Sequence, residues 1–195
     1  MLVPMRAILD AADKNGYAQG AFNVNAVCQV KAAVDVHQIL RSPAIIQGAD
    51  LANGFMGGRT DFANSTLEDK KAGAKNIGAA VKKYAADSDI PVALHLDHGK
   101  NFDSCIAAIE GGYTSVMIDG SSLPFDENVE LTREVVKYAH ERGVTVEGEL
   151  GVLAGVEDHV FVATSTYTNP LSAIDFFKKT GVDALAISYG TMHGA

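Results

Sequence analysis

Short apolar runs alternate with longer amphipathic runs along nearly the whole chain. The short runs predict buried strands, and the longer runs, with apolar positions three or four residues apart, predict helices. Strands are expected at residues 20–24, 43–47, 92–96, 115–118, 144–150 and 184–188. Helices are expected at residues 27–40, 72–85, 102–110, 126–142 and 170–179, and polar loops at residues 48–67 and 151–169.

This strand–helix alternation predicts a parallel sheet with right-handed crossovers. An open doubly wound sheet and a closed barrel share that order, but no G-x-G-x-x-G follows the first strand, which disfavours a dinucleotide-binding sheet. Barrel enzymes place catalytic groups at the carboxyl ends of several strands. Polar or ionisable residues end five of the six strands here: Asn23, Gln47, Asp97 with His98, Asp119, and Glu149. We therefore predict an α/β fold of the (β/α)8 TIM-barrel type, with six β/α units in one domain over residues 1–195.

The composition is that of an ordinary soluble globular protein, with 47% hydrophobic and 21% charged residues. A formal net charge of −8 argues against nucleic acids and anionic membrane surfaces as partners. No segment approaches the ~18 consecutive apolar residues of a membrane span, and the first residues lack the order of a signal peptide. Cys28 and Cys105 lie in apolar helical patterns, so we expect packed, reduced thiols and a cytoplasmic protein.

Two histidines at strand ends are the main candidates for chemistry. The run Pro91-Val-Ala-Leu-His-Leu-Asp-His-Gly99 delivers Asp97 and His98 at the end of a buried strand, and the final strand leads to His193. Two such histidines suggest a shared metal ion, with the adjacent carboxylate left to move protons. A histidine packed and hydrogen-bonded in the core is the alternative for each.

The other histidines are expected to have no direct role. His95 alternates with leucines and is interpreted as a buried residue of the core or behind the site. His37 and His140 lie in predicted helices and are expected at the surface, and His159 in a polar loop.

Six segments together resemble the class II, metal-dependent fructose-bisphosphate aldolases and the related ketose-bisphosphate aldolases. They appear in the family's order and span nearly the whole chain: Gly20-Ala-Phe-Asn-Val-Asn25, Pro91 to Gly99, Gly112 to Ser121, Val146-Glu-Gly-Glu-Leu-Gly151, Tyr167-Thr-Asn-Pro170, and Thr180 to Ala186 running into Gly190-Thr-Met-His-Gly194. The resemblance implies the eight-stranded barrel. It also implies zinc-dependent, reversible cleavage of fructose 1,6-bisphosphate to dihydroxyacetone phosphate and glyceraldehyde 3-phosphate in glycolysis and gluconeogenesis.

The resemblance assigns metal and proton-transfer roles to particular residues. His98 and His193 match two of the family's three zinc ligands, and Asp97 matches its acid/base residue. Asp119 and Glu149 match positions used for an alternative or second metal position, for a divalent or monovalent cation. Each has a plainer alternative, since Asp97 could orient His98, and the other two carboxylates could cap helices or bind water.

Further residues match substrate contacts. Asn23 corresponds to a substrate-binding residue, and Gly194 to one whose backbone approaches the ketose phosphate. Glu157, in a loop resembling the family's mobile flap, is the candidate to move the proton at the ketose carbon, with a solvated loop charge as its alternative. Glu147 points the same way as Glu149 and could instead form an internal ion pair. Many family members have a phosphate-binding serine after the second strand, whereas this chain has Gln47-Gly-Ala-Asp50.

Several alternatives remain open at this point. The sequence does not separate fructose bisphosphate from tagatose bisphosphate. A non-catalytic metal-binding or structural member of the family is a second hypothesis, and a metal-independent sugar-phosphate barrel is a third. Because a barrel needs eight strands, we expect these residues to belong to a chain ~100 residues longer. The third zinc histidine and most phosphate-binding backbone would then follow Ala195. We expect the 195 residues alone to be aggregation-prone and inactive, and the full-length protein to be a homodimer or homotetramer.

Overall fold

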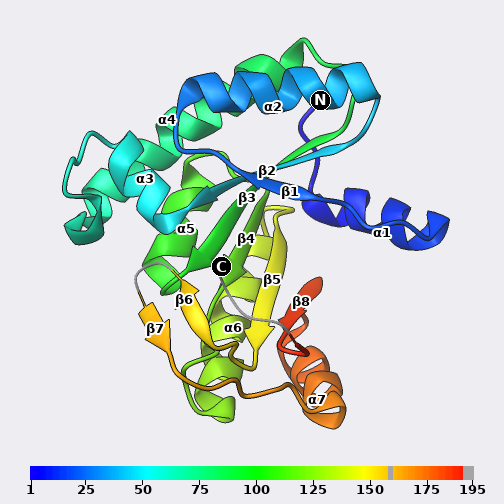
Figure 1. Cartoon of the computed structure of the whole chain (residues 1–195), viewed down its shortest axis with the longest axis vertical. Helices are drawn as coiled ribbons and strands as arrows, with labels where there is room; N and C mark the ends of the chain where they lie inside the picture. The colour runs from blue at the N-terminus through cyan, green and yellow to red at the C-terminus, as the bar shows by residue number, and fades with distance from the viewer. Residues whose placement is uncertain (158–159, 191–195) are drawn as a thin grey trace.

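The computed structural model describes residues 1–157 and 160–190, and its elements follow the expected alternation (Figure 1). The strands are β1 (Ala21–Asn23), β2 (Ala44–Ala49), β3 (Val92–Gly99), β4 (Ser115–Ile118), β5 (Thr145–Leu150), β6 (Gly155–Glu157), β7 (Val160–Val162) and β8 (Ala184–Ile187). The helices are α1 (Met5–Asn15), α2 (Val27–Leu40), α3 (Asp50–Met56), α4 (Leu67–Ala86), α5 (Phe102–Glu110), α6 (Phe125–His140) and α7 (Pro170–Thr180), with a 3-10 turn, η1, at Phe62–Asn64.

Six parallel strands form one sheet in the order β1-β2-β3-β4-β5-β8. The order never reverses, and α2, α4, α5 and α6 pack on one face of the sheet, so the sheet is wound in a single direction (Figure 1). A doubly wound sheet would have helices on both faces. The six strands are thus part of a TIM-type barrel, as the strand-end pattern predicted.

Alternation along each strand separates two groups of side chains. Ile46, Leu94 and Val116 face the outer helices and belong to the main hydrophobic core. Ile45 and Ala93, one position away, face the inside, where α1 covers them. The pattern analysis assigned no element before residue 20, so α1 is an addition to the expected fold. It contacts β3 beside the amino ends of the strands.

The expected loop at residues 48–67 is wrong over much of its length, because α3 and η1 lie within it. Gly57, at the end of α3, and Gly73, within α4, allow these two helices to pack closely. A Cβ at Gly57 would lie 1.9 Å from the carbonyl oxygen of Asp69, and one at Gly73 would lie 1.7 Å from that of Asn53. Helix α4 also begins five residues earlier than expected, at Leu67, because Thr66 and Asp69 form a capping box.

Three smaller expectations are also corrected. The expected polar loop at residues 151–169 contains the antiparallel pair β6–β7. His37, expected at the surface, is buried beside Phe22, with Nδ1 2.7 Å from the carbonyl oxygen of Ala33. Cys28, expected to be packed, is exposed, whereas Cys105 is buried as expected. Among the described residues, no helix has both the length and the apolar character that crossing a membrane requires.

Candidate metal and proton-transfer site

The end of β3 departs from regular strand geometry. His98 has a φ of 49°, in the left-handed region, and the pairing of β3 with β4 shifts register between Leu96 and Gly99. In a regular strand, Asp97 and His98 would face opposite sides of the sheet. The bulge instead turns both side chains toward one cavity of about 220 Å³. The strain therefore places a carboxylate and an imidazole side by side at the strand end.

Three potential metal ligands converge beside this bulge. His98 Nδ1 lies 3.2 Å from Asp119 Oδ2, after β4, and 3.4 Å from Glu149 Oε2, in β5. One ligand atom from each residue lies within 4.8 Å of the other two. Ligand atoms 2.0–2.1 Å from a tetrahedral zinc ion are about 3.3 Å apart, so the two distances to His98 fit such an ion. The donor set of one imidazole nitrogen and two carboxylate oxygens is also suitable for zinc.

Asp119 is held in its ionised form. Burial by itself raises the pKa of this carboxyl, but hydrogen bonds from His98 and Ser121, together with the Lys100 ammonium, hold it well below its usual range. The Ser121 backbone N–H and hydroxyl both donate to Asp119 Oδ1, at 3.1 and 2.6 Å. Oδ2 is thereby directed toward His98. Lys100 and Ser121 were not singled out from the sequence, although a serine two residues after an aspartate is a common turn signal.

Asp97 is oriented by the first strand of the sheet. Asn23 Nδ2, in β1, donates a 2.9 Å hydrogen bond to Asp97 Oδ2. Asp97 Oδ1 lies 3.8 Å from His98 Nε2. The structure thus brings the predicted substrate-binding residue Asn23 against the predicted acid/base residue, which the sequence pattern did not anticipate.

A second polar group lies beneath the cavity. His95 is buried, as expected, with Nδ1 2.8 Å from Ser115 Oγ and Nε2 3.4 Å from Glu147 Oε2. Burial lowers the pKa of His95 to about 4. Burial, together with the Asp97 charge, raises the pKa of Glu147 to about 7. The alternative for Glu147 was an internal ion pair. Its carboxyl does contact His95, but a His95 pKa of about 4 leaves the imidazole uncharged at neutral pH, and the Glu147 side chain also lines the cavity.

The remaining predicted site residues stay predictions. His193, Gly194 and His159 lie outside the described residues. Glu157 is placed only as the last residue of β6.

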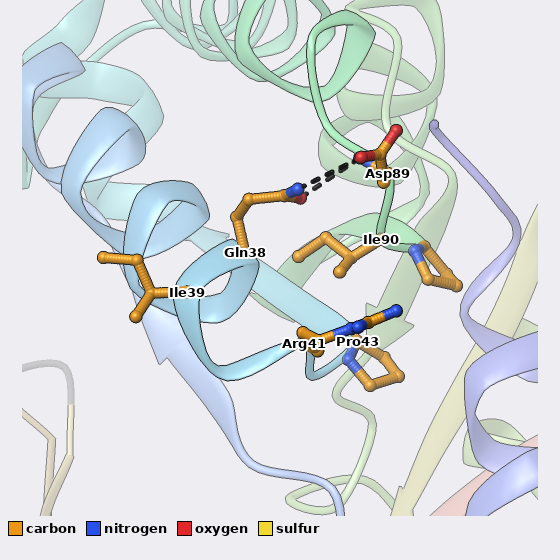
Figure 2. A pocket seen from close by; sticks show the side chains of 7 residues that line it. Gln38, Ile39, Arg41, Pro43, Asp89 and Ile90 are labelled. Carbon is orange, nitrogen blue, oxygen red and sulfur yellow. Dashed lines mark hydrogen bonds between the residues drawn. The ribbon is translucent and has the colours of Figure 1, made fainter.

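A larger cavity, of about 650 Å³, lies elsewhere in the molecule. Its walls include Pro43 and Pro91, just before β2 and β3, so it opens at the amino ends of the strands. Figure 2 shows the Gln38 side chain directed at Asp89, with Nε2 3.5 Å from Oδ2. Among the residues that line this cavity, Asp89 supplies the one carboxylate and no histidine is present. This cavity therefore lacks the set of metal-ligating side chains found at the carboxyl ends of the strands.

Comparisons with known proteins agree with the resemblance noted from the motifs. A family model described as fructose-bisphosphate aldolase class-II matches residues 3–195. The chain is 48% identical over 197 aligned residues to a fructose-bisphosphate aldolase of Treponema pallidum, covering 99% of this chain and 55% of that protein. It is 40% identical to one of Geobacillus stearothermophilus, covering 99% of this chain and 63% of that protein. The chain thus spans less than two thirds of the length of these relatives.

Solved structures show the same arrangement. The YdjI aldolase of Escherichia coli K12 superposes with a TM-score of 0.78 at 31% identity, over all of this chain and 63% of its own. A putative fructose-1,6-bisphosphate aldolase of Coccidioides immitis superposes with a TM-score of 0.80 at 26% identity, over 97% of this chain and 61% of its own.

Proposed function

The chain belongs to the class II fructose-bisphosphate aldolase family, and we propose that it carries the metal and proton-transfer centre of an enzyme that reversibly cleaves fructose 1,6-bisphosphate. The products would be dihydroxyacetone phosphate and glyceraldehyde 3-phosphate. The observation that supports this most directly is the convergence of His98, Asp119 and Glu149 within 4.8 Å, beside Asp97.

We propose that the metal is zinc, held by His98 together with Asp119, Glu149 or both. His193 would add a further ligand. Bound zinc supplies Lewis-acid polarisation of the substrate ketone, so that no Schiff-base lysine is needed. The protein's own contribution here is to keep Asp119 ionised through Ser121 and Lys100 and to aim His98 Nδ1 at the two carboxylates.

Asp97 is proposed as the acid/base residue for the C4 hydroxyl. Cleavage of the C3–C4 bond requires removal of the C4 hydroxyl proton, and condensation requires its return. Asn23 fixes one oxygen of the carboxylate, while Asp97 lines the cavity where the substrate chain would lie. In this account Asn23 acts through Asp97, in addition to the substrate contact that the family resemblance implies.

The other assignments from the resemblance complete the proposal. Glu157 would move the proton at the ketose carbon that becomes the nucleophile, and the Gly194 backbone would bind the ketose phosphate. We propose a cytoplasmic enzyme of glycolysis and gluconeogenesis that acts as a homodimer or homotetramer. The buried thiol of Cys105, whose pKa is raised by burial, fits a reducing compartment.

Metal analysis and a cleavage assay on the same preparation test this function. The protein is expressed from its complete gene, and elemental analysis is expected to find about one zinc per chain. A coupled assay is expected to show faster cleavage of fructose bisphosphate than of tagatose bisphosphate. Absence of any divalent ion would rule out the mechanism. Equal rates on the two sugars would remove only the preference for fructose, and zinc without turnover would favour a non-catalytic member of the family.

A further inference from the structure

Three polar side chains from three neighbouring strands form a chain beneath the site, and the proposed mechanism uses none of them. Ser115 begins β4, His95 lies in β3, and Glu147 lies in β5. Ser115 Oγ is 2.8 Å from His95 Nδ1, and His95 Nε2 is 3.4 Å from Glu147 Oε2. The His95 side chain is only 3% exposed and that of Glu147 is 23% exposed. The chain therefore runs from the closed interior to the wall of the 220 Å³ cavity.

Such a chain is unfavourable for stability alone. Taking an imidazole and a carboxyl group out of water costs free energy that their mutual contact only partly offsets, and apolar residues of similar volume would often be as stable. On the same face, the interior around Ile45 and Ala93 is filled with apolar side chains. The polar residues thus occupy positions that packing by itself would give to apolar ones.

The hydrogen bond between Ser115 and His95 gives the chain a direction. The Ser115 hydroxyl has two acceptors within reach, His95 Nδ1 at 2.8 Å and the thioether of Met5 at 3.7 Å. Thioether sulfur is a weak acceptor, so donation to Nδ1 is favoured. Nε2 then carries the proton of the neutral ring, and it lies 3.4 Å from Glu147 Oε2, a contact longer than a normal hydrogen bond. No hydrogen bond or ion pair from the described residues reaches the second oxygen, Oε1.

We propose that Glu147 is a further substrate-binding residue, whose free oxygen accepts a hydrogen bond from a hydroxyl group of the sugar chain, and that His95 and Ser115 are its positioning residues. The inference rests on the proposed function and adds a contact to it. The cavity wall also contains the carboxylates of Asp97 and Glu149, and apolar side chains such as Met117 and Ile187. A wall rich in acceptors attracts hydroxyl donors and repels phosphate, so it fits the polyhydroxyl middle of the sugar and not its phosphate ends.

Amide substitutions separate the positioning role from a merely structural one. In His95→Gln the amide nitrogen can take the place of Nε2 and still reach Glu147. In His95→Asn the shorter side chain can take the place of Nδ1 and reach Ser115, but it leaves Glu147 without its partner. In Glu147→Gln the amide oxygen would face His95, so that an NH2 group would replace the acceptor in the cavity. All three changes retain polar side chains of similar shape.

The experiment measures the affinity of the zinc-loaded protein for fructose bisphosphate by calorimetry in an Asp97→Ala background, which slows cleavage during the titration. KM and kcat are measured without that background change. Leaving a buried polar group without its hydrogen-bond partner costs enough for Glu147→Gln and His95→Asn each to weaken binding by about 10- to 100-fold. His95→Gln is expected to remain within about threefold of the wild type. Tyr113→Phe is the matched control, because it removes one buried hydrogen bond, to Asn53, away from the cavity. It is expected to lower the melting temperature and leave affinity and KM unchanged.

Three results would overturn the inference. Wild-type affinity in folded Glu147→Gln would show that its carboxylate does not bind substrate, while leaving the proposed aldolase activity intact. Equal affinities of His95→Gln and His95→Asn would show that contact with Glu147 is not what His95 supplies, and this comparison holds even if Glu147→Gln does not fold. A zinc-loaded wild-type protein that binds no sugar bisphosphate would overturn both this inference and the proposed function.

Discussion

The inner face of the sheet has two ends of opposite character. At the amino end, Met5 and Ile8 of α1 pack against Ile45 and Ala93, and each of these side chains is at most 4% exposed. At the carboxyl end, the same face presents Asp97, His98 and Glu149 around an open cavity, with Asp119 beside His98. In β3, Ala93 and Asp97 are only four residues apart.

We interpret this difference as a division of roles: the amino end stabilises the fold, and the carboxyl end holds the groups proposed for catalysis. The amino end is close-packed and apolar, so it resists deformation and contributes free energy of folding. The carboxyl end contains a residue with φ of 49° and several half-buried carboxylates, each of which is unfavourable for stability. The packed end thus supports a strained end, whose geometry fits the metal and substrate binding proposed above.

The largest effect is expected from the two adjacent residues at the carboxyl end. His98→Ala is expected to lose metal binding and aldolase activity together, because it removes a ligand atom. Asp97→Ala is expected to keep the metal and to lose a factor of roughly 10²–10⁴ in kcat, the usual worth of a positioned proton-transfer group. Elemental analysis and steady-state kinetics on both variants measure this difference. Equal loss of metal in the two variants would show that Asp97 has a structural role.

The second prediction concerns the amino end. Ile8→Ala is expected to lower the free energy of unfolding by about 2–5 kcal/mol, because it leaves a cavity against Ile45. Metal bound per folded chain is expected to remain unchanged. Ile39→Ala is the matched control, since this isoleucine of α2 is 78% exposed, and its effect is expected to stay within about 0.5 kcal/mol. Urea denaturation followed by circular dichroism measures both, and loss of metal in folded Ile8→Ala would contradict the separation of the two ends.

Hydrophobic patterning predicted the main sheet well, and the reason is local. Residues 102–110 and 115–118 have the expected bounds as helix and strand, because each is an apolar run closed by glycine or polar residues. Helix α3 was missed because Gly54 and the glycines after it resembled loop residues, although Gly57, at the end of α3, and Gly73, in α4, allow the two helices to pack closely. Close approach between two segments cannot be inferred from either segment alone.

The site was predicted in its composition and only partly in its geometry. Strand-end position identified Asp97, His98, Asp119 and Glu149, and parallel pairing then brings such residues to one edge of the sheet. The bulge at His98 was not predicted, because histidine, although enriched among non-glycine residues at positive φ, adopts such a φ too rarely to mark the position. The Asn23–Asp97 hydrogen bond joins residues 74 positions apart, so it depends on the register between strands.

The smallest effect is expected in the outer layer, near the carboxyl end. If the inner face at the carboxyl end is used for catalysis, the contacts that stabilise the carboxyl end should lie in the outer layer of helices. Helix α4 follows β2 and starts on this side, where the Thr66 hydroxyl accepts from the Asp69 backbone N–H and the Asp69 carboxylate accepts from the Thr66 backbone N–H. Thr66→Ala is expected to lower the free energy of unfolding by about 1 kcal/mol without changing metal content.

The effect of this cap should also depend on pH. Hydrogen bonds from the Thr66 backbone and side chain hold the pKa of Asp69 below its ordinary 3.8. A carboxyl whose pKa is lower in the folded state stabilises that state above its unfolded pKa and loses this contribution as the pH falls through the folded value. The difference between wild type and Thr66→Ala should therefore be full near neutral pH and shrink below about pH 4. Urea titrations at several pH values test this, and a difference that stayed constant down to pH 2 would show that the hydrogen bond from the Thr66 hydroxyl to the Asp69 carboxylate contributes nothing to the cap.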